Sequence, residues 1–155
     1  MNSELEELYQ QVVLDHSKRP RNFGTLADAI HVHGDNPSCG DEIDLHVQFA
    51  PDGSVADVKF TGQGCAISLA SASLMTLKLK GRPRADAEKM ARAFHDLVTT
   101  PNLDAPRELG DLRLLAGVQK FPQRVKCAML AWRAFEQALQ APHAPAPVTT
   151  EQAPD

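Results

Sequence analysis

The three cysteines of this 155-residue chain are the residues best suited to chemistry, and each lies in a different local setting. Cys39 lies in a short segment that contains proline and glycine. Cys65 directly follows a Gly-Gln-Gly segment, and Cys127 ends a basic segment. Because thiolates are both nucleophiles and soft metal ligands, the sequence predicts metal binding, sulfur chemistry or both at these positions.

A carboxylate accompanies Cys39, because Asp41 follows it after a single glycine. Residues two apart in a turning loop can face one centre, and Gly40 permits the bend. Three thiolates and one carboxylate supply the four ligands of a tetrahedral zinc site, so we expect Cys39, Asp41, Cys65 and Cys127 to hold one Zn²⁺. The three thiolates also suit a [2Fe–2S] cluster. Spacing leaves both possibilities open, since it matches no zinc-finger pattern.

For any single cysteine the simpler interpretation is a small buried hydrophobic residue. The local settings favour reactive thiols instead. Cys65 lies where a strand gives way to a helix, and the free N–H groups there favour an anionic sulfur. Cys127 lies roughly 140° from the middle of the apolar stripe of its expected helix. That stripe comprises Val125, Met129, Trp132, Glu136 and Leu139. Arg124 and Lys126 are close to Cys127 in the sequence, and we expect these two cations to lower the pKa of the Cys127 thiol.

Hydrophobic periodicity predicts the elements that position these residues. Apolar and polar residues alternate along 43–49 and 55–60, and a Pro-Asp-Gly-Ser turn between them is typical of an antiparallel hairpin. A further short strand is expected from residue 31. Helices are expected at about residues 5–16, 66–80, 86–98 and 122–140, with Asp86 capping the third, and residues 99–119 are expected to be a loop with one short helix. Segregated strands and helices predict an α+β fold, with helices on one face of a small antiparallel sheet of about three strands.

Length and composition indicate a single domain over residues 1–140. Residues 141–155 are rich in proline, alanine and threonine, and we expect them to form a disordered tail. The net charge of −4, with acidic and basic residues interspersed, argues against nucleic acid as a partner. The sequence contains no secretory signal and no apolar run of the ~20 residues that span a bilayer. The odd number of cysteines argues against disulfides, so we expect a cytoplasmic protein without a membrane partner.

Three histidines, His31, His33 and His46, fall on the expected strands. His31 and His33 share one strand face, which raises the question of a second metal site. Because no cysteine or carboxylate spacing fits around them, we interpret them as solvated side chains on an outward face.

Several motifs resemble those of the iron–sulfur cluster assembly family typified by IscU and the N-terminal part of NifU, and most of all its SufU branch. The matching stretches are residues 8–16, 19–24, 36–41, 60–68, 70–75 and 124–128. Scaffold-type members carry a histidine directly before the last cysteine, where this chain has Lys126. SufU-like members carry extra residues between the second and third cysteines, which fits the long interval from Cys65 to Cys127.

The resemblance implies an IscU/SufU-like fold in which Cys39, Asp41, Cys65 and Cys127 bind zinc. It also implies a zinc-dependent sulfurtransferase that accepts persulfide sulfur from a SufS-like cysteine desulfurase and feeds downstream iron–sulfur assembly proteins. Within that function we expect Cys39 to accept the sulfur. Cys127 is the alternative acceptor, and Arg124 is expected to support the anionic sulfur.

Two other functions remain open at this stage. The three cysteines would hold a transient [2Fe–2S] cluster in a scaffold, which is a binding module and not an enzyme, although Lys126 counts against this. A purely structural zinc ion is the third hypothesis. It is the weakest, because a chain of this length buries roughly 70% of its unfolded surface and does not need metal to fold.

Overall fold

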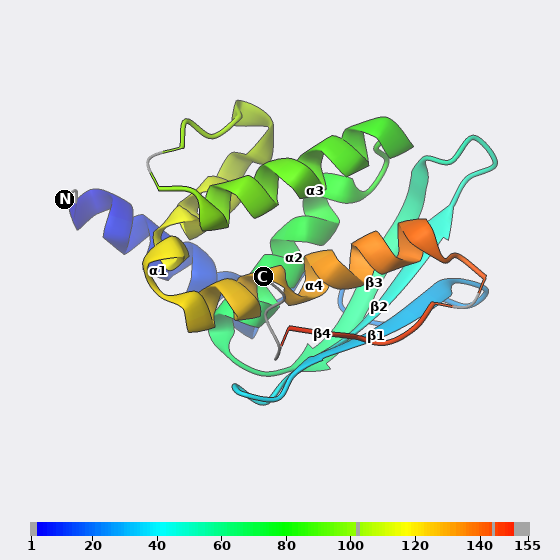
Figure 1. Ribbon diagram of the computed structural model, residues 1–155, viewed down its shortest axis with the longest axis horizontal. Helices are drawn as coiled ribbons and strands as arrows, with labels where there is room; N and C mark the ends of the chain where they lie inside the picture. Colours follow the sequence, from blue (N-terminus) through cyan, green and yellow to red (C-terminus); the bar gives the residue numbers. More distant parts are fainter. Residues whose placement is uncertain (1–2, 102, 144, 151–155) are drawn as a thin grey trace.

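The computed structural model describes residues 3–101, 103–143 and 145–150, and over these residues the chain forms one four-stranded sheet with helices packed against it (Figure 1). The strand order is β3-β2-β1-β4. The elements in chain order are α1 (Ser3–Lys18), β1 (Ile30–Asn36), β2 (Asp41–Phe49), β3 (Val55–Gln63), α2 (Ala66–Leu79), α3 (Arg84–Thr99), the 3-10 segment η1 (Arg107–Lys120), α4 (Pro122–Gln140) and β4 (Val148–Thr149).

The sheet is antiparallel from β3 through β2 to β1, as the alternation of apolar and polar residues predicted. Because successive strand residues point to opposite faces, one face collects the apolar side chains. The buried ones are Val32, Ile43, Leu45, Val47, Val58 and Phe60. Helix α2 packs against β3, and helix α4 packs against β1 and β2 (Figure 1). The predicted α+β architecture, with helices on one face of a small sheet, is therefore confirmed.

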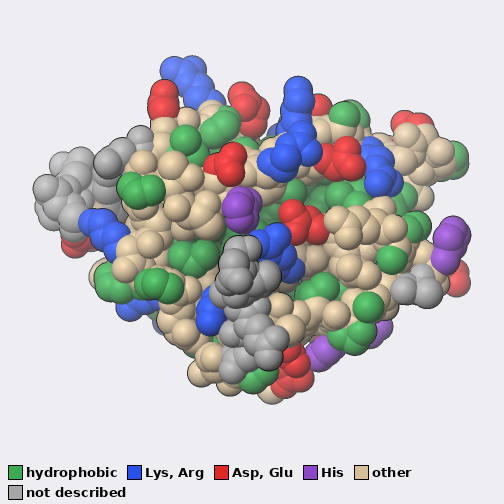
Figure 2. All heavy atoms as spheres, viewed as in Figure 1, with side chains coloured by type: hydrophobic (Ala, Val, Ile, Leu, Met, Phe, Trp, Pro, Cys, Tyr) green, Lys and Arg blue, Asp and Glu red, His purple; other side chains and the backbone are tan. Residues whose placement is uncertain are grey.

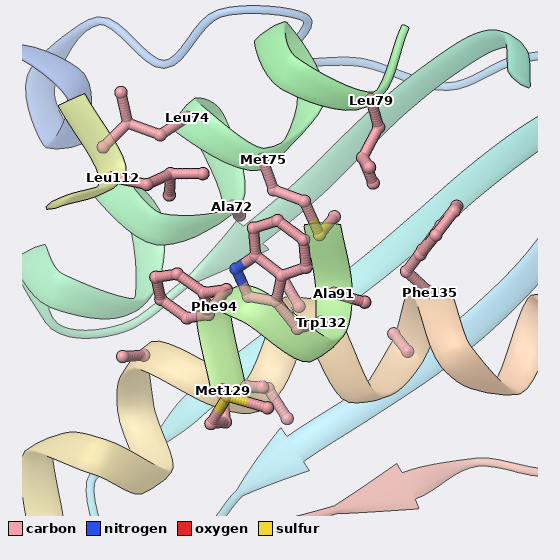
Figure 3. Packing of buried hydrophobic residues seen from close by; sticks show 14 of the residues in the cluster. Ala72, Leu74, Met75, Leu79, Ala91, Phe94, Leu112, Met129, Trp132 and Phe135 are labelled. Carbon is pink, nitrogen blue, oxygen red and sulfur yellow. The ribbon is translucent and has the colours of Figure 1, made fainter. Parts of the chain in front are cut away.

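Helix α4 is buried on almost every side, because it lies between the sheet and helices α2, α3 and η1. The single apolar stripe expected from the sequence was too narrow, since the buried residues also include Ala128, Leu130, Ala131, Ala134 and Phe135. Trp132 lies among these buried residues with its ring stacked on Phe94, at 4.7 Å between centroids (Figure 3). Its Nε1 donates to Ser71 Oγ. A residue of α4 that lies off the predicted apolar stripe, such as Cys127, is therefore also buried.

Two local expectations differ from the structure. Helix α3 begins at Arg84 after Pro83, so Asp86 lies inside its first turn and is not its cap. The segment expected to be mostly loop forms η1, which has a kink at Gly110 where φ is 55°. Its buried residues recur every third position, which matches the three residues per turn of a 3-10 helix. These residues are Leu109, Leu112, Leu115 and Val118.

The tail adds a short strand to the sheet. Val148–Thr149 pairs in parallel with Gly34 and Asp35, and the Thr150 N–H donates to the Asp35 carbonyl at 3.1 Å. The absent Gly34 side chain makes room, because a Cβ there would lie 2.9 Å from Val148 Cγ2. Residues 148–150 of the segment expected to be disordered thus lie against the sheet. The expectation for the segment as a whole stays a prediction, and residues 144 and 151–155 lie outside the described part of the chain.

Acidic and basic side chains are interspersed on the face shown in Figure 2 and do not gather into one basic area. Of the helices that the structure describes, none combines the length and the apolar character that crossing a bilayer requires.

Candidate metal centre

The loop between β1 and β2 supplies the first half of the centre. Asn36 and Asp41 are the last paired residues of this hairpin. Between them the Cys39 N–H donates to the Asn36 carbonyl at 3.1 Å, and Gly40 takes a left-handed φ of 69°, which glycine adopts readily. Cys39 is thus partly exposed in the loop, whereas Asp41, at the start of β2, is fully buried.

Cys65 caps the N-terminus of α2. Its backbone is extended, and its Sγ accepts a hydrogen bond from the Ser68 N–H at 3.4 Å. The Cys65 N–H donates to Asp41 Oδ1 at 2.8 Å. Gly64, with φ of 147°, precedes it, and an added Cβ there would lie 2.8 Å from the Asp41 α-carbon. The junction between β3 and α2 is therefore built directly against the Asp41 carboxylate.

Cys127 enters the centre from α4 and is only 3% exposed. The sequence placed it off the apolar stripe, and the structure gives it polar neighbours. Asn36 Nδ2 donates to the Cys127 Sγ at 3.5 Å, and the side chain of Cys65 hydrogen-bonds to that of Cys127. Cys127 is buried in the polar centre and does not act as core filling.

The four residues expected as ligands meet in space, although their positions in the chain are far apart. Cys39 Sγ, a carboxylate oxygen of Asp41 and Cys127 Sγ all lie within 4.8 Å of one another. Cys65 Sγ lies 3.7 Å from Asp41 Oδ2. Three sulfurs and one carboxylate oxygen are a donor set that suits tetrahedral Zn²⁺. The chemistry of the residues present therefore fits this ion.

The thiols of Cys65 and Cys127 shift each other's pKa in opposite directions. The hydrogen bond from Cys127 lowers the pKa of the Cys65 thiol, and the Ser68 N–H adds to this effect. The same contact with Cys65, together with burial, raises the pKa of the Cys127 thiol. The expectation that nearby cations would lower the pKa of Cys127 is therefore wrong, because burial and the anionic neighbours outweigh them.

Arg124 lies beside a cavity of about 530 Å³ whose lining also includes Tyr9, Lys120 and Phe121. Its guanidinium carbon lies 4.7 Å from the centroid of the Phe121 ring. Burial raises the pKa of Tyr9, the charge of Arg124 lowers it in part, and Cys65 raises it further. Arg124 and Cys65 are thus both within electrostatic reach of Tyr9. The supporting role expected for Arg124 stays a prediction.

Sequence reasoning missed two amide side chains of the centre. Asn36 is fully buried, and its Nδ2 also donates to Asp41 Oδ2 at 3.4 Å; its Oδ1 has no hydrogen-bond partner among the described residues. Gln123 Nε2 donates to Cys39 Sγ at 3.2 Å. One signal was available for Gln123, which precedes Cys127 by four residues and therefore shares its helix face.

The three strand histidines lie on the face of the sheet opposite the helices. His31 Nε2 and His33 Nδ1 lie 2.8 and 3.0 Å from the same oxygen of Asp44, and His31 stacks on His46. Partial burial raises the pKa of Asp44, but the hydrogen bonds from His31 and His33 outweigh it and lower that pKa. Pairing of β1 with β2 places the Asp44 carboxylate beside His31 and His33, which their spacing in the sequence did not reveal. These residues form a partly exposed ion-pair cluster.

Comparisons with known proteins point to one family. The family model described as NifU-like N terminal domain matches residues 8–128. The chain is 46% identical over 138 residues to the zinc-dependent sulfurtransferase SufU of Bacillus subtilis, covering 89% of this chain and 93% of the relative. It is also 46% identical over 138 residues to the iron–sulfur cluster assembly scaffold protein IscU of Streptococcus pyogenes, covering 89% and 86%. A crystal structure of a hypothetical protein superimposes with a TM-score of 0.80 at 46% identity, covering 86% of this chain and 98% of that one.

Proposed function

Because the chain belongs to the NifU-like N-terminal domain family, we propose that it is a zinc-dependent sulfurtransferase that accepts persulfide sulfur from a SufS-like cysteine desulfurase for iron–sulfur cluster assembly. The observation that carries this proposal is the convergence of three sulfurs and one buried carboxylate. Cys39, Asp41 and Cys127 have donor atoms within 4.8 Å of one another, and Cys65 lies beside them. A relative with 46% identity bears the name of this activity.

We assign Cys39, Asp41, Cys65 and Cys127 as the zinc ligands. Bound Zn²⁺ keeps coordinating thiols deprotonated at neutral pH. Asp41 is held by the Cys65 N–H and by Asn36, which orient its carboxylate toward the sulfurs. A purely structural ion explains less, because the hydrophobic core already spans the sheet and the helices.

Cys39 is the favoured acceptor because its sulfur has the greatest freedom of the three. It lies in the loop between β1 and β2 and is partly exposed. Cys65 is fixed as the cap of α2, and Cys127 is 3% exposed. A bulky protein donor can reach a sulfur in a surface loop more readily than one inside a helix interface. Cys127 remains the alternative acceptor.

The transfer is a thiol–persulfide exchange. The thiolate of Cys39 attacks the outer sulfur of the donor's persulfide, a new S–S bond forms on Cys39, and the S–S bond of the donor breaks. The donor cysteine leaves as a thiolate, and the proton of the persulfide stays with the transferred sulfur. No external oxidant or reductant is needed. Arg124 is assigned a supporting role for the anionic sulfur, because it is a cation one helical turn before Cys127 and both it and Cys65 shift the pKa of Tyr9.

The test is transfer of radiolabelled sulfur from a cysteine desulfurase supplied with labelled cysteine. The Cys39→Ala protein is expected to accept no sulfur, and in the unchanged protein the label is expected on the peptide that contains Cys39. If Cys39→Ala accepts sulfur at the rate of the unchanged protein, the assignment of Cys39 is wrong. Zinc content is measured on every variant, because loss of the ion must be separated from loss of the acceptor.

The alternative function is a scaffold on which a transient [2Fe–2S] cluster is assembled on Cys39, Cys65 and Cys127 and then transferred. It is favoured by the relative from Streptococcus pyogenes, which is named a scaffold protein and has the same 46% identity. Lys126 counts against it, because it stands where the family resemblance places a histidine in scaffold-type members. Anaerobic reconstitution with iron and sulfide, followed by visible spectroscopy, separates the two functions. A stable cluster in a folded protein supports the scaffold.

The proposed reaction needs reduced thiols, so we place it in the cytoplasm, where disulfides rarely persist. Downstream iron–sulfur assembly proteins are the expected recipients of the sulfur.

A further inference from the structure

Each of the three sulfurs accepts one N–H hydrogen bond, and each donor comes from a different part of the fold. The pairs are the Ser68 N–H with Cys65 at 3.4 Å, Asn36 Nδ2 with Cys127 at 3.5 Å and Gln123 Nε2 with Cys39 at 3.2 Å. Hydrogen bonds to an anionic acceptor are stronger than those between neutral groups. The donors therefore help to decide how firmly each thiolate is held.

The three donors differ in their freedom to move. The Ser68 N–H belongs to the backbone in the first turn of α2, so it cannot leave Cys65 unless the helix start unwinds. Asn36 is fully buried between β1 and α4 and is tied to Asp41 as well. Gln123, in contrast, is exposed in the first turn of α4. Its long side chain can swing into solvent without disturbing the core, so only the Cys39 contact is readily reversible.

The loop on the other side of this contact has open space beside it at Gly40. Gly40 follows Cys39 with a φ of 69°, and none of the described residues has an atom within 4 Å of the position that a Cβ there would occupy. Cys39 is partly exposed, whereas the neighbouring Asp41 is fully buried. Motion of the Cys39 sulfur away from the centre therefore requires the loss of the Gln123 contact, of its contact with Cys127 and, in the zinc-loaded protein, of its bond to the ion.

We propose that Gln123 is a positioning residue that restrains the Cys39 sulfur at the centre and releases it for sulfur transfer. This inference rests on the proposed function, because it explains why one sulfur of three is free to react. Gln123 touches no reacting sulfur other than Cys39 in the contacts described, and it acts by limiting how often that sulfur turns toward the donor. The choice of Cys39 over Cys65 and Cys127 then follows from the mobility of its hydrogen-bond donor.

The test uses the full-length protein loaded with one equivalent of Zn²⁺ and treated with iodoacetamide. The labelling rate of each cysteine is followed separately by mass spectrometry. Gln123→Leu keeps the bulk of the side chain but removes the donor, so Cys39 is expected to be alkylated roughly fivefold faster, as for the loss of one hydrogen bond. The rates at Cys65 and Cys127 are expected to stay unchanged.

Two further variants make the result specific. Gln123→Arg keeps an N–H donor at the same position and is expected to restore slow labelling of Cys39. Gln11→Leu, at an exposed glutamine of α1, is the matched control and is expected to have no effect. The proposal is overturned if Gln123→Leu leaves Cys39 labelling unchanged, or if all three cysteines become faster together, because that would indicate a loosened fold.

A second arm distinguishes this inference from the proposed function. In single-turnover transfer of radiolabelled sulfur, Gln123→Leu is expected to load Cys39 roughly fivefold faster than the unchanged protein. If the unchanged protein accepts no sulfur, the proposed function fails, whereas the alkylation result still decides whether Gln123 restrains Cys39. If the protein accepts sulfur but the Gln123→Leu variant loads Cys39 at the same rate as the unchanged protein, the proposed function stands and the inference fails.

Discussion

Gly64 lies so close to Asp41 that a Cβ on Gly64 would be 2.8 Å from the Asp41 α-carbon and would also strike the carboxylate. The same carboxylate accepts a hydrogen bond from the Cys65 N–H and lies next to the Cys65 sulfur. Position 64 therefore has to be empty of a side chain for the hairpin end and the start of α2 to meet. The geometry of the candidate metal centre depends on this one absent methyl group.

We predict that Gly64→Ala weakens zinc binding by at least about tenfold, because Asp41 must move away from the sulfurs. The φ of 147° adds a backbone cost of roughly 1–3 kcal/mol for a residue with a Cβ. Competition with a metal chelator measures the affinity, and chemical denaturation measures the stability. Gly117→Ala is the matched control, since its added Cβ would have no atom of the described residues within 4 Å. Equal zinc affinities for the two variants would contradict the prediction.

We predict that Asn36→Ala lowers zinc affinity by about 10-fold to 100-fold without removing a ligand. Asn36 is fully buried and donates to both Asp41 and Cys127, so its loss leaves two ligand groups without their orienting partner. The visible spectrum of the Co²⁺-substituted protein is expected to change at the same time, because the sulfur positions change. An unaltered spectrum together with unaltered affinity would show that Asn36 serves only to fill space.

We predict that Gly34→Ala detaches β4 from the sheet. The added Cβ would lie 2.9 Å from Val148 Cγ2 and 3.1 Å from Leu130 Cδ1, and the strand pairs with β1 over only two residues. The amide of Thr150, which donates to Asp35, is expected to exchange its hydrogen much faster. In the double variant Gly34→Ala/Val148→Ala the clash is relieved, so protection of the Thr150 amide is expected to return in part. Protection that persists in the single variant would contradict this account.

We predict a loss of stability below about pH 6.5 that depends on His16. Burial lowers the pKa of this histidine, which is 6% exposed and hydrogen-bonded to Ser73 Oγ at 2.7 Å. The unfolded chain, with an ordinary pKa near 6.5, binds a proton first as the pH falls, so protonation favours unfolding. The free energy of unfolding should therefore decrease as the pH falls below about 6.5, and it should level off once the folded protein is protonated as well.

The measurement is chemical denaturation at several pH values between about 7 and 5. His16→Gln should flatten the pH dependence. Part of the pH dependence should remain in this variant, because burial and His31 also lower the pKa of His46. Gln11→Leu, at an exposed and uncharged residue of α1, is the control and should leave the slope as it was. A slope unchanged by His16→Gln would show that His16 is not responsible.

Much of the fold could be predicted because its signals are local. The alternation of apolar and polar residues along β2 and β3 predicted which side chains face the core, and Pro122 marked the start of α4. The errors arose where long-range packing decided the outcome. Val148 pairs with β1 only because Gly34, more than a hundred residues earlier, leaves it space. The apolar surface of α4 was underestimated because no local pattern shows that a helix is covered on two sides.

By itself, the sequence determined which residue types are available for chemistry at the centre: three thiols, one carboxylate, and the glycines that let the backbone bend around them. Those are properties of single residues and their neighbours, so they can be recognised without coordinates. Only the tertiary structure decided that Asn36 and Gln123 donate to two of the sulfurs, and that Cys65 and Cys127 shift each other's pKa in opposite directions. Hydrogen bonds and pKa shifts of this kind depend on distances of a few ångströms between residues remote in the chain, and these distances exist only after the helices and the sheet have packed together.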